Sequence, residues 1–132
     1  SVPVVANGDA GTLDDAACML DQSGADAIMI GRAHYGAPWL AGRIAAGAAG
    51  DEMASENDIS DYVISHYEDM LTLYGSLQGV RHARKHLGWY LDRHAPGTSP
   101  ELRRAVMTAL EPATVIAALR AAFAAQDMRS AA

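Results

Sequence analysis

The chain has 132 residues, of which half are apolar and a fifth are charged. This balance permits a packed core and excludes a wholly disordered chain. The single cysteine, Cys18, excludes an internal disulfide and favours a reducing, cytoplasmic compartment. The N-terminus lacks the basic and apolar regions of a secretory signal, and no apolar run approaches the roughly 20 residues of a membrane span, so we expect no membrane association.

The first third of the chain predicts a strand, a helix and a second strand. Residues 2–6 are apolar and end in Asn-Gly-Asp, which indicates a strand that leads into a loop. Thr12 and Asp15 have the spacing of a capping box, and Gly24 is placed to end the helix that follows. Residues 27–30 form a second apolar run. Strands without polar alternation predict a βαβ unit of a parallel sheet that is buried on both faces.

Two strands alone leave unpaired backbone groups and a bare apolar face, so a stable sheet needs further strands. Residue 1 is a serine, and an apolar strand follows almost at once. We therefore expect that this sequence is part of a longer protein and that residues 1–47 form the edge of a larger α/β domain.

The remainder of the chain predicts helices. A short helix is expected over residues 39–46, and residues 48–57, rich in Gly, Ala, Ser and acids, predict a linker between two domains. Residues 58–132 then predict an all-α helical bundle. Its expected helices span residues 58–74, residues 77–94, a segment that opens at Ser99-Pro100, and residues 112–125, with a frayed tail over residues 126–132. Most of the large aromatic residues are expected in the core, namely Trp39, Tyr62, Tyr67, Tyr74, Trp89 and Tyr90.

Polar and glycine residues follow both predicted strands. Asn7, Gly8 and Asp9 follow the first strand, and Gly31 and Arg32 follow the second. In a (β/α)8 barrel, the loops after the last two strands commonly form a phosphate site. Glycine lets backbone N–H groups approach an anion, and arginine can bind two phosphate oxygens at once. The two loops therefore predict an anion site suited to a flavin phosphate, although Asn-Gly alone is also an ordinary turn.

The net charge of −6 is unevenly distributed along the chain. Residues 76–105 hold six basic and two acidic residues, a local charge of +4, while the remainder holds four basic and fourteen acidic residues, a charge of −10. This asymmetry favours a local surface for an anionic partner. The alternative is an ordinary solvated helix face.

Much of this positive charge lies on the helix predicted over residues 77–94. At 100° per residue, its core side is formed by Val80, Ala83, Leu87, Tyr90 and Leu91. Arg81 and Lys85 share a different side, and Arg84 lies at the border of the core. The side opposite the core is expected to carry His82, His86 and Trp89. Cations beside histidine and indole rings suit a phosphate backbone and its bases, so the candidate RNA-binding residues are Arg81, His82, Arg84, Lys85 and His86.

The residues offer little for catalysis or metal binding. His82 and His86 have i, i+4 spacing, but cations surround them and no acidic ligand separates them, so we expect no metal site. Cys18 is expected within a helix as a packed small residue rather than as a nucleophile. The sequence contains no P-loop, no dinucleotide-binding glycine motif and no nucleophile elbow.

At these same residues the sequence resembles the bacterial tRNA-dihydrouridine synthase family. The likeness covers residues 1–95 well and the last two helices loosely. It rests on the runs Pro3-Val4-Val5-Ala6-Asn7-Gly8-Asp9, Gly24 to Ala33, Gly36-Ala37-Pro38-Trp39-Leu40, His66-Tyr67, Tyr74-Gly75 and Val80 to Tyr90. Other flavin barrels share the phosphate loops but not the basic helix.

The resemblance implies the last βαβ portion of a TIM barrel that binds FMN, followed by a helical tRNA-binding domain. Such enzymes use NADPH to reduce FMN, which then reduces a uridine of the tRNA D-loop to 5,6-dihydrouridine. Asn7, Gly8 and Asp9 match the flavin-binding loop, and Gly31 and Arg32 match the phosphate pair. The positions expected to meet tRNA are matched by Arg81, Arg84 and Lys85.

The family's catalytic cysteine and a flavin-contacting lysine lie upstream of the matched segment. We therefore expect no catalytic residue in this chain, no activity from this segment alone, and a monomeric, cytoplasmic parent enzyme.

Two alternatives remain open on the sequence. Another FMN TIM-barrel oxidoreductase, acting on a small molecule, would explain the first 46 residues equally well but leaves the basic helix without a purpose. A non-catalytic helical module that binds RNA or protein, with a barrel remnant attached, would explain the second part of the chain.

Overall fold

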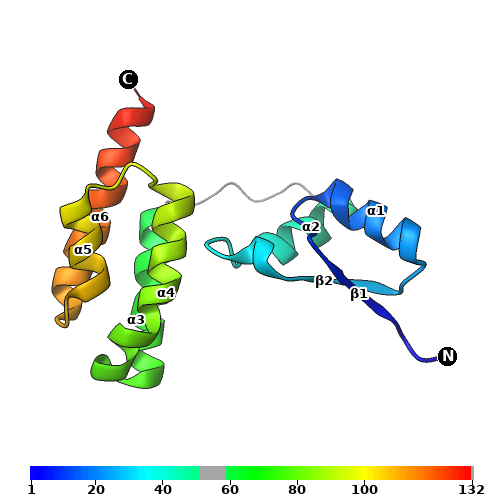
Figure 1. Ribbon diagram of the computed structural model, residues 1–132, viewed down its shortest axis with the longest axis horizontal. Coiled ribbons are helices and arrows are strands. Elements are labelled where there is room, and N and C mark those ends of the chain that lie inside the picture. The colour runs from blue at the N-terminus through cyan, green and yellow to red at the C-terminus, as the bar shows by residue number, and fades with distance from the viewer. Residues whose placement is uncertain (51–58, 132) are drawn as a thin grey trace. The chain divides into compact units, whose positions relative to one another are not determined.

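The computed structural model describes residues 1–50 and 59–131, and the chain divides into two compact units, residues 1–55 and 56–132. The first unit contains β1 (Val5–Gly8), α1 (Leu13–Ser23), β2 (Ala27–Ile30), the 3-10 helix η1 (Arg32–His34) and α2 (Leu40–Ala49). The second contains α3 (Ile59–Tyr74), α4 (Ser76–His94), α5 (Pro100–Thr108) and α6 (Pro112–Ser130) (Figure 1). The linker predicted over residues 48–57 lies outside the described residues, apart from its first three positions.

β1 and β2 form a parallel two-stranded sheet, with Val5 opposite Ala27 and Gly8 opposite Ile30. The prediction of a first strand over residues 2–6 is wrong in its bounds. The Val4 N–H donates to the Asp26 carboxylate at 2.8 Å instead of to a strand carbonyl. The backbone ladder therefore begins at Val5 and continues through the Asn-Gly pair.

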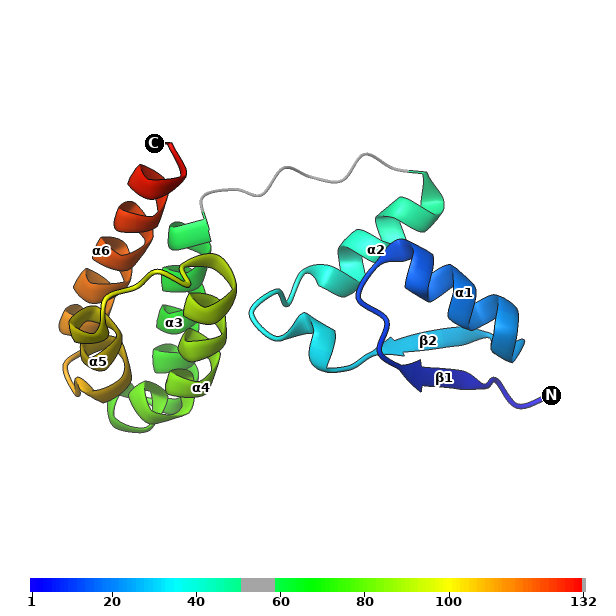
Figure 2. The ribbon, with the colours of Figure 1, turned by 45° about the horizontal axis from the view of Figure 1, so that its top comes forward.

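The sheet is covered on one face. α1 packs against both strands, and Figures 1 and 2 show α1 and α2 on the same side of the sheet. Half-buried and exposed residues alternate along each strand, and Val5 and Met29 are among the exposed ones. The prediction of burial on both faces is therefore not met within the described residues, because no described element packs on the second face.

Local signals set the bounds of α1. Thr12 and Asp15 form the predicted capping box, in which the Asp15 N–H donates to Thr12 Oγ1 at 3.1 Å and the Thr12 N–H donates to Asp15 Oδ2 at 2.9 Å. Hydrogen bonding with the Thr12 side chain lowers the pKa of the Asp15 carboxyl. Gly24 ends the helix, as predicted, and its N–H donates to the Leu20 carbonyl at 2.9 Å. Cys18 is exposed on this helix, so the prediction that it is a packed residue is wrong.

α2 extends three residues beyond its predicted end. The helix runs to Ala49, and Gly50 ends it with a left-handed φ of 77°. Gly47 lies inside this helix. A Cβ at this position would stand 3.2 Å from Leu13 Cδ2, so the glycine permits close packing against α1.

The helical unit is built from neighbours that run alternately up and down, as Figure 1 shows. α3 packs mainly against α4, and α5 packs mainly against α6. The predicted core stripe of α4 is confirmed, since Val80, Ala83, Leu87, Tyr90 and Leu91 are all buried. Other elements of the unit contribute the buried residues Val63, Ile64, Tyr67, Ala95, Val106, Val115, Ala118, Leu119, Ala122 and Phe123. Burial of each large apolar side chain stabilises the fold by about 1.5–3 kcal/mol.

Two of the tyrosines predicted in the core are exposed. Tyr62 and Tyr74 lie at opposite ends of α3 and are 41% and 49% exposed, whereas Tyr67 and Tyr90 are buried as predicted. Apolar spacing indicates the correct face of a helix, but a residue at the last turn can project beyond the partner that covers that face.

α6 continues to Ser130, so the prediction that it ends near residue 125 is wrong. The segment contains no glycine or proline that would stop a helix. Arg129, in its last turn, also packs against the turn that follows α4, where a Cβ on Gly97 would stand 2.8 Å from the Arg129 Nη2 atom. In the described part of the chain, we find no helix with the length and apolar character that crossing a bilayer requires.

α4 approaches the backbone of α3 closely at Gly79. A Cβ at this position would stand 2.8 Å from both Leu71 Cα and the Met70 carbonyl oxygen, which are backbone atoms of α3. We expect Gly79→Ala to lower the free energy of unfolding by about 1–3 kcal/mol, because the two helices must separate to admit the methyl group. Urea unfolding followed by far-UV circular dichroism measures this change.

Gly88→Ala is the matched control on the same helix. Its Cβ would meet only the flexible end of Met107, at 3.6 Å. The better helix propensity of alanine should then leave the stability unchanged or raise it by up to about 1 kcal/mol. Equal unfolding midpoints for Gly79→Ala and the unmodified protein would contradict the packing argument.

Candidate functional site

The ends of the two parallel strands form a concavity of about 400 Å³. Because β1 and β2 are parallel, the loops that follow them leave the sheet at the same edge. The concavity is lined by Asn7, Gly8, Asp9, Met29, Gly31 and Arg32. The structure therefore brings together all five residues that the sequence predicts to bind a cofactor.

Arg32 supplies positive charge to this concavity. Its Nη2 atom donates to Asp9 Oδ1 at 3.2 Å, and the two side chains are 78% and 88% exposed. Exposed ion pairs of this kind contribute about 0–1 kcal/mol, since water competes for both partners. An anionic ligand can therefore take the guanidinium from Asp9 at little cost, whereas the carboxylate itself would repel that ligand.

The backbone is accessible at the end of β2. The atom nearest to a Cβ on Gly31 would be Asn7 Oδ1, at 3.9 Å, so a ligand group can approach the main chain there. η1 begins directly after Gly31, and sequence periodicity did not predict this 3-10 helix.

Met29 is a lining residue that the sequence reasoning missed. It stands opposite Asn7 in the sheet register and is 49% exposed on the same open face. The two-residue alternation of a strand could have identified it, because residues 29 and 31 fall on one face.

The predicted RNA-binding residues share α4 but differ in their surroundings. Arg81, His82 and Lys85 are exposed, whereas Arg84 and His86 are half-buried. Lys85 Nζ lies 4.9 Å from the centroid of the Trp89 ring, a cation–π distance. Exposed cations at positions i and i+4 form one continuous basic side of the helix.

Arg84 joins α4 to its neighbours. Its Nη2 atom donates to the Thr108 carbonyl at 3.4 Å, and its Nε atom is buried. Burial raises the pKa of the Tyr67 hydroxyl, and the positive charge of Arg84 opposes this rise. A substitution of Arg84 would thus change the packing of the bundle as well as its charge.

The helical spacing predicts that His86 lies on the side of α4 opposite the core. This prediction is wrong, because His86 is half-buried beside α3. Its ring centroid is 5.7 Å from that of His66 on α3 and 5.2 Å from that of Trp89. His66 Nδ1 and the Tyr90 hydroxyl share a hydrogen bond of 2.8 Å, and burial raises the pKa of Tyr90. The α3 side of α4 therefore carries a row of aromatic contacts.

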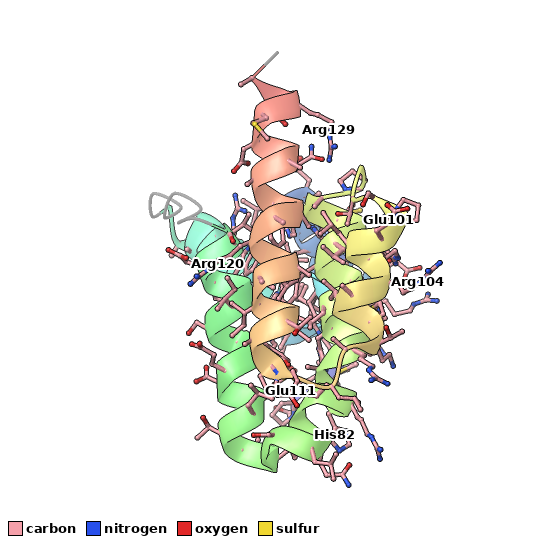
Figure 3. All side chains as sticks on the ribbon, turned by 90° about the vertical axis from the view of Figure 1, so that its left-hand side faces the viewer. His82, Glu101, Arg104, Glu111, Arg120 and Arg129 are labelled. Carbon is pink, nitrogen blue, oxygen red and sulfur yellow. The ribbon has the colours of Figure 1, made fainter. Side chains whose placement is uncertain are left out.

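Figure 3 shows the helical unit with α6 in front. Arg104 points outward from α5, and Arg120 lies on the other side of α6 in this view. Arg103, beside Arg104, is held by Asp92 of α4 at 2.8 Å. Positive charge is therefore presented along α4 and α5, while Arg120 lies apart from it.

Metal ligation has no support in residues 1–50 and 59–131, where no three His, Cys, Asp or Glu side chains cluster suitably.

The comparisons with known proteins match both units. A family model described as Dihydrouridine synthase (Dus) matches residues 1–127. The chain is 49% identical over 119 residues to a probable tRNA-dihydrouridine synthase of Rhizobium leguminosarum bv. phaseoli, covering 90% of the chain and 36% of that protein.

Two further relatives give the same result. The chain is 45% identical over 130 residues to a probable tRNA-dihydrouridine synthase of Rhodobacter capsulatus, covering 96% of the chain and 39% of that protein. It is 42% identical over 125 residues to the tRNA-dihydrouridine synthase B of Xanthomonas axonopodis pv. citri, covering 92% of the chain and 37% of that protein. The chain thus spans between 36% and 39% of the length of these relatives. Because the family model covers nearly all of it, the chain belongs to the dihydrouridine synthase family.

Proposed function

We propose that the protein containing this chain is a flavin-dependent tRNA-dihydrouridine synthase. In this proposal, residues 1–47 form the closing edge of an FMN-binding TIM barrel, and residues 58–132 form a helical tRNA-binding domain. The observation that carries the proposal is the meeting of Asn7, Gly8, Asp9, Gly31 and Arg32 at one concavity, in a chain whose family membership covers both units.

The residues around the concavity fit an FMN phosphate. Arg32 offers a guanidinium whose pairing with Asp9 is weak, and Gly31 leaves the backbone open to close approach. Asn7 adds an amide that can donate or accept hydrogen bonds. The carboxylate of Asp9 is suited to a hydroxyl or ring N–H rather than to the phosphate.

The chain's own contribution to the reaction is binding and orientation. When bound, FMN supplies the hydride chemistry by which NADPH saturates the C5–C6 bond of a uracil ring. Arg32 and the strand-end backbone would hold the phosphate end and so fix the position of the cofactor. In this proposal, the proton for the second carbon comes from the catalytic cysteine expected upstream of this chain.

The basic side of α4 supports the tRNA half of the proposal. Arg81 and Lys85 are exposed one turn apart, and the core stripe behind them is buried, so the helix can present its cations to a phosphate backbone. A target uridine must leave its stack to reach a flavin, so a domain that grips the surrounding RNA determines which uridine arrives.

The family match favours this function over the two alternatives. It includes α3, α4 and α5 together with the strand-end loops, so one family accounts for both units. A small-molecule flavoenzyme leaves the basic helix without a purpose, and a non-catalytic helical module leaves the concavity without one.

The reaction is tested by mapping dihydrouridine in tRNA from a strain that lacks the gene. We expect at least one D-loop position to lose the modification and the intact gene to restore it. Dihydrouridine unchanged at every position, in a strain with no second member of the family, would contradict the proposal.

The phosphate role of Arg32 is tested by titrating FMN and riboflavin into the complete protein and following the flavin fluorescence. Loss of a charge-assisted hydrogen bond costs about 1.5–3 kcal/mol, so Arg32→Ala should raise the Kd for FMN about 10- to 100-fold. Riboflavin, which lacks the phosphate, should bind both proteins equally. Equal losses for the two ligands would show that Arg32 acts on the fold or on the ring instead.

The RNA role of α4 is tested by measuring tRNA affinity at several salt concentrations. Each lost phosphate contact lowers the slope of log K against log salt by about 0.7–0.9, so the double variant Arg81→Ala, Lys85→Ala should lower it by about 1.5. Arg120→Ala, an exposed cation on α6, is the matched control and should leave the slope unchanged. Identical slopes for the unmodified protein, the double variant and Arg120→Ala would show that α4 does not contact the RNA backbone.

A further inference from the structure

We propose that Tyr74 and His82 form a stacking platform for an unpaired base of the bound RNA, beside the phosphates held by Arg81 and Lys85. The proposal deepens the RNA-binding role of the helical unit and rests on it. In this proposal, the surface recognises a nucleotide whose base is not stacked within an RNA helix.

The two rings meet on the surface of the unit. Tyr74 is the last residue of α3 and is 49% exposed, and His82 is an exposed residue of the second turn of α4. Their centroids are 4.9 Å apart, and their planes are inclined by 42°. The pair thus extends an exposed aromatic surface over two helices rather than filling the core between them.

The turn between the helices holds this surface in place. Gly75 has a φ of 73°, which lets α4 begin directly after α3 without a longer loop. Gly79 then packs against the backbone of Leu71, so the last turn of α3 and the first turns of α4 lie in close contact. A rigid aromatic surface loses little conformational entropy when a ligand covers it.

The chain on either side of the ring pair is apolar and basic. Leu73 and Leu77 flank Tyr74 in the sequence and are 73% and 64% exposed. The segment from residue 70 to residue 91 carries three cations and no acidic residue. Figure 3 shows His82 at the end of the unit that also holds Glu111, the residue before α6.

The position of the cations beside the ring pair favours a nucleotide over a protein as the partner of this surface. Arg81 precedes His82, and Lys85 follows it by about one turn, so positive charge adjoins the platform on the same helix. An exposed aromatic surface beside cations matches a nucleotide, whose base stacks while its phosphate pairs with the cation. A protein partner would need acidic groups around an apolar contact to match the same surface.

The test is tRNA binding by the complete protein with Tyr74→Leu and Tyr74→Phe, each measured at several salt concentrations. Loss of stacking should raise the Kd of Tyr74→Leu by on the order of tenfold, with an unchanged salt slope because no phosphate contact is lost. Tyr74→Phe retains the ring and should bind as the unmodified protein does. Tyr62→Leu, which removes the tyrosine at the other end of α3, is the matched control and should also bind normally.

Three results would overturn the proposal. Equal weakening by Tyr74→Leu and Tyr74→Phe would assign the effect to the hydroxyl group. Normal tRNA binding by Tyr74→Leu, with a lowered thermal midpoint of the complete protein, would show that the Tyr74 ring stabilises the fold and does not bind RNA. Normal tRNA binding and normal stability of Tyr74→Leu would show that the platform has no role. In that case, a lowered salt slope in the Arg81→Ala, Lys85→Ala double variant would still support the proposed function. If the unmodified protein fails to bind tRNA, the proposed function fails first.

Discussion

The close contact of α4 with α3 determines what the helical unit can present to solvent. At Gly79 the helices approach until a single methyl group would collide with backbone atoms, and the stripe through Val80, Ala83 and Leu87 is buried behind this contact. Once this stripe faces inward, the 100° spacing of the helix turns Arg81 and Lys85 outward. The basic side of α4 is therefore a geometric consequence of core packing.

Parallel pairing imposes the corresponding constraint on the first unit. Strands that run in the same direction end at the same edge, so Asn7 and Arg32, distant in the sequence, line one concavity. An antiparallel pair would have placed the two loops at opposite edges. The face of the sheet that α1 and α2 leave open exposes Val5 and Met29.

The differences between prediction and structure occur mainly where an element ends or meets another. The helix after η1 continues through Gly47 because that glycine packs against Leu13. α6 continues to Ser130, where its last turn packs against the turn after α4. Tyr74 has the spacing of a core residue, yet it projects from the end of α3 to meet His82. A hydrophobic pattern cannot report these outcomes, because it contains no information on the length or position of the partner.

The sequence by itself determined the order of the strands and α-helices, the capping box at Thr12, the proline starts of α5 and α6, and the core stripe of α4. These features depend on backbone chemistry and on periodicity within about four residues, so one sequence is enough to predict them. It also determined the five residues that meet at the ends of the strands, since parallel pairing follows from the βαβ order. Tertiary structure alone decided that His86 contacts His66, that Arg84 bridges α4 to Thr108, and that Tyr74 lies beside His82. Each of these depends on contacts between different elements, and the geometry of those contacts is fixed only when the elements pack.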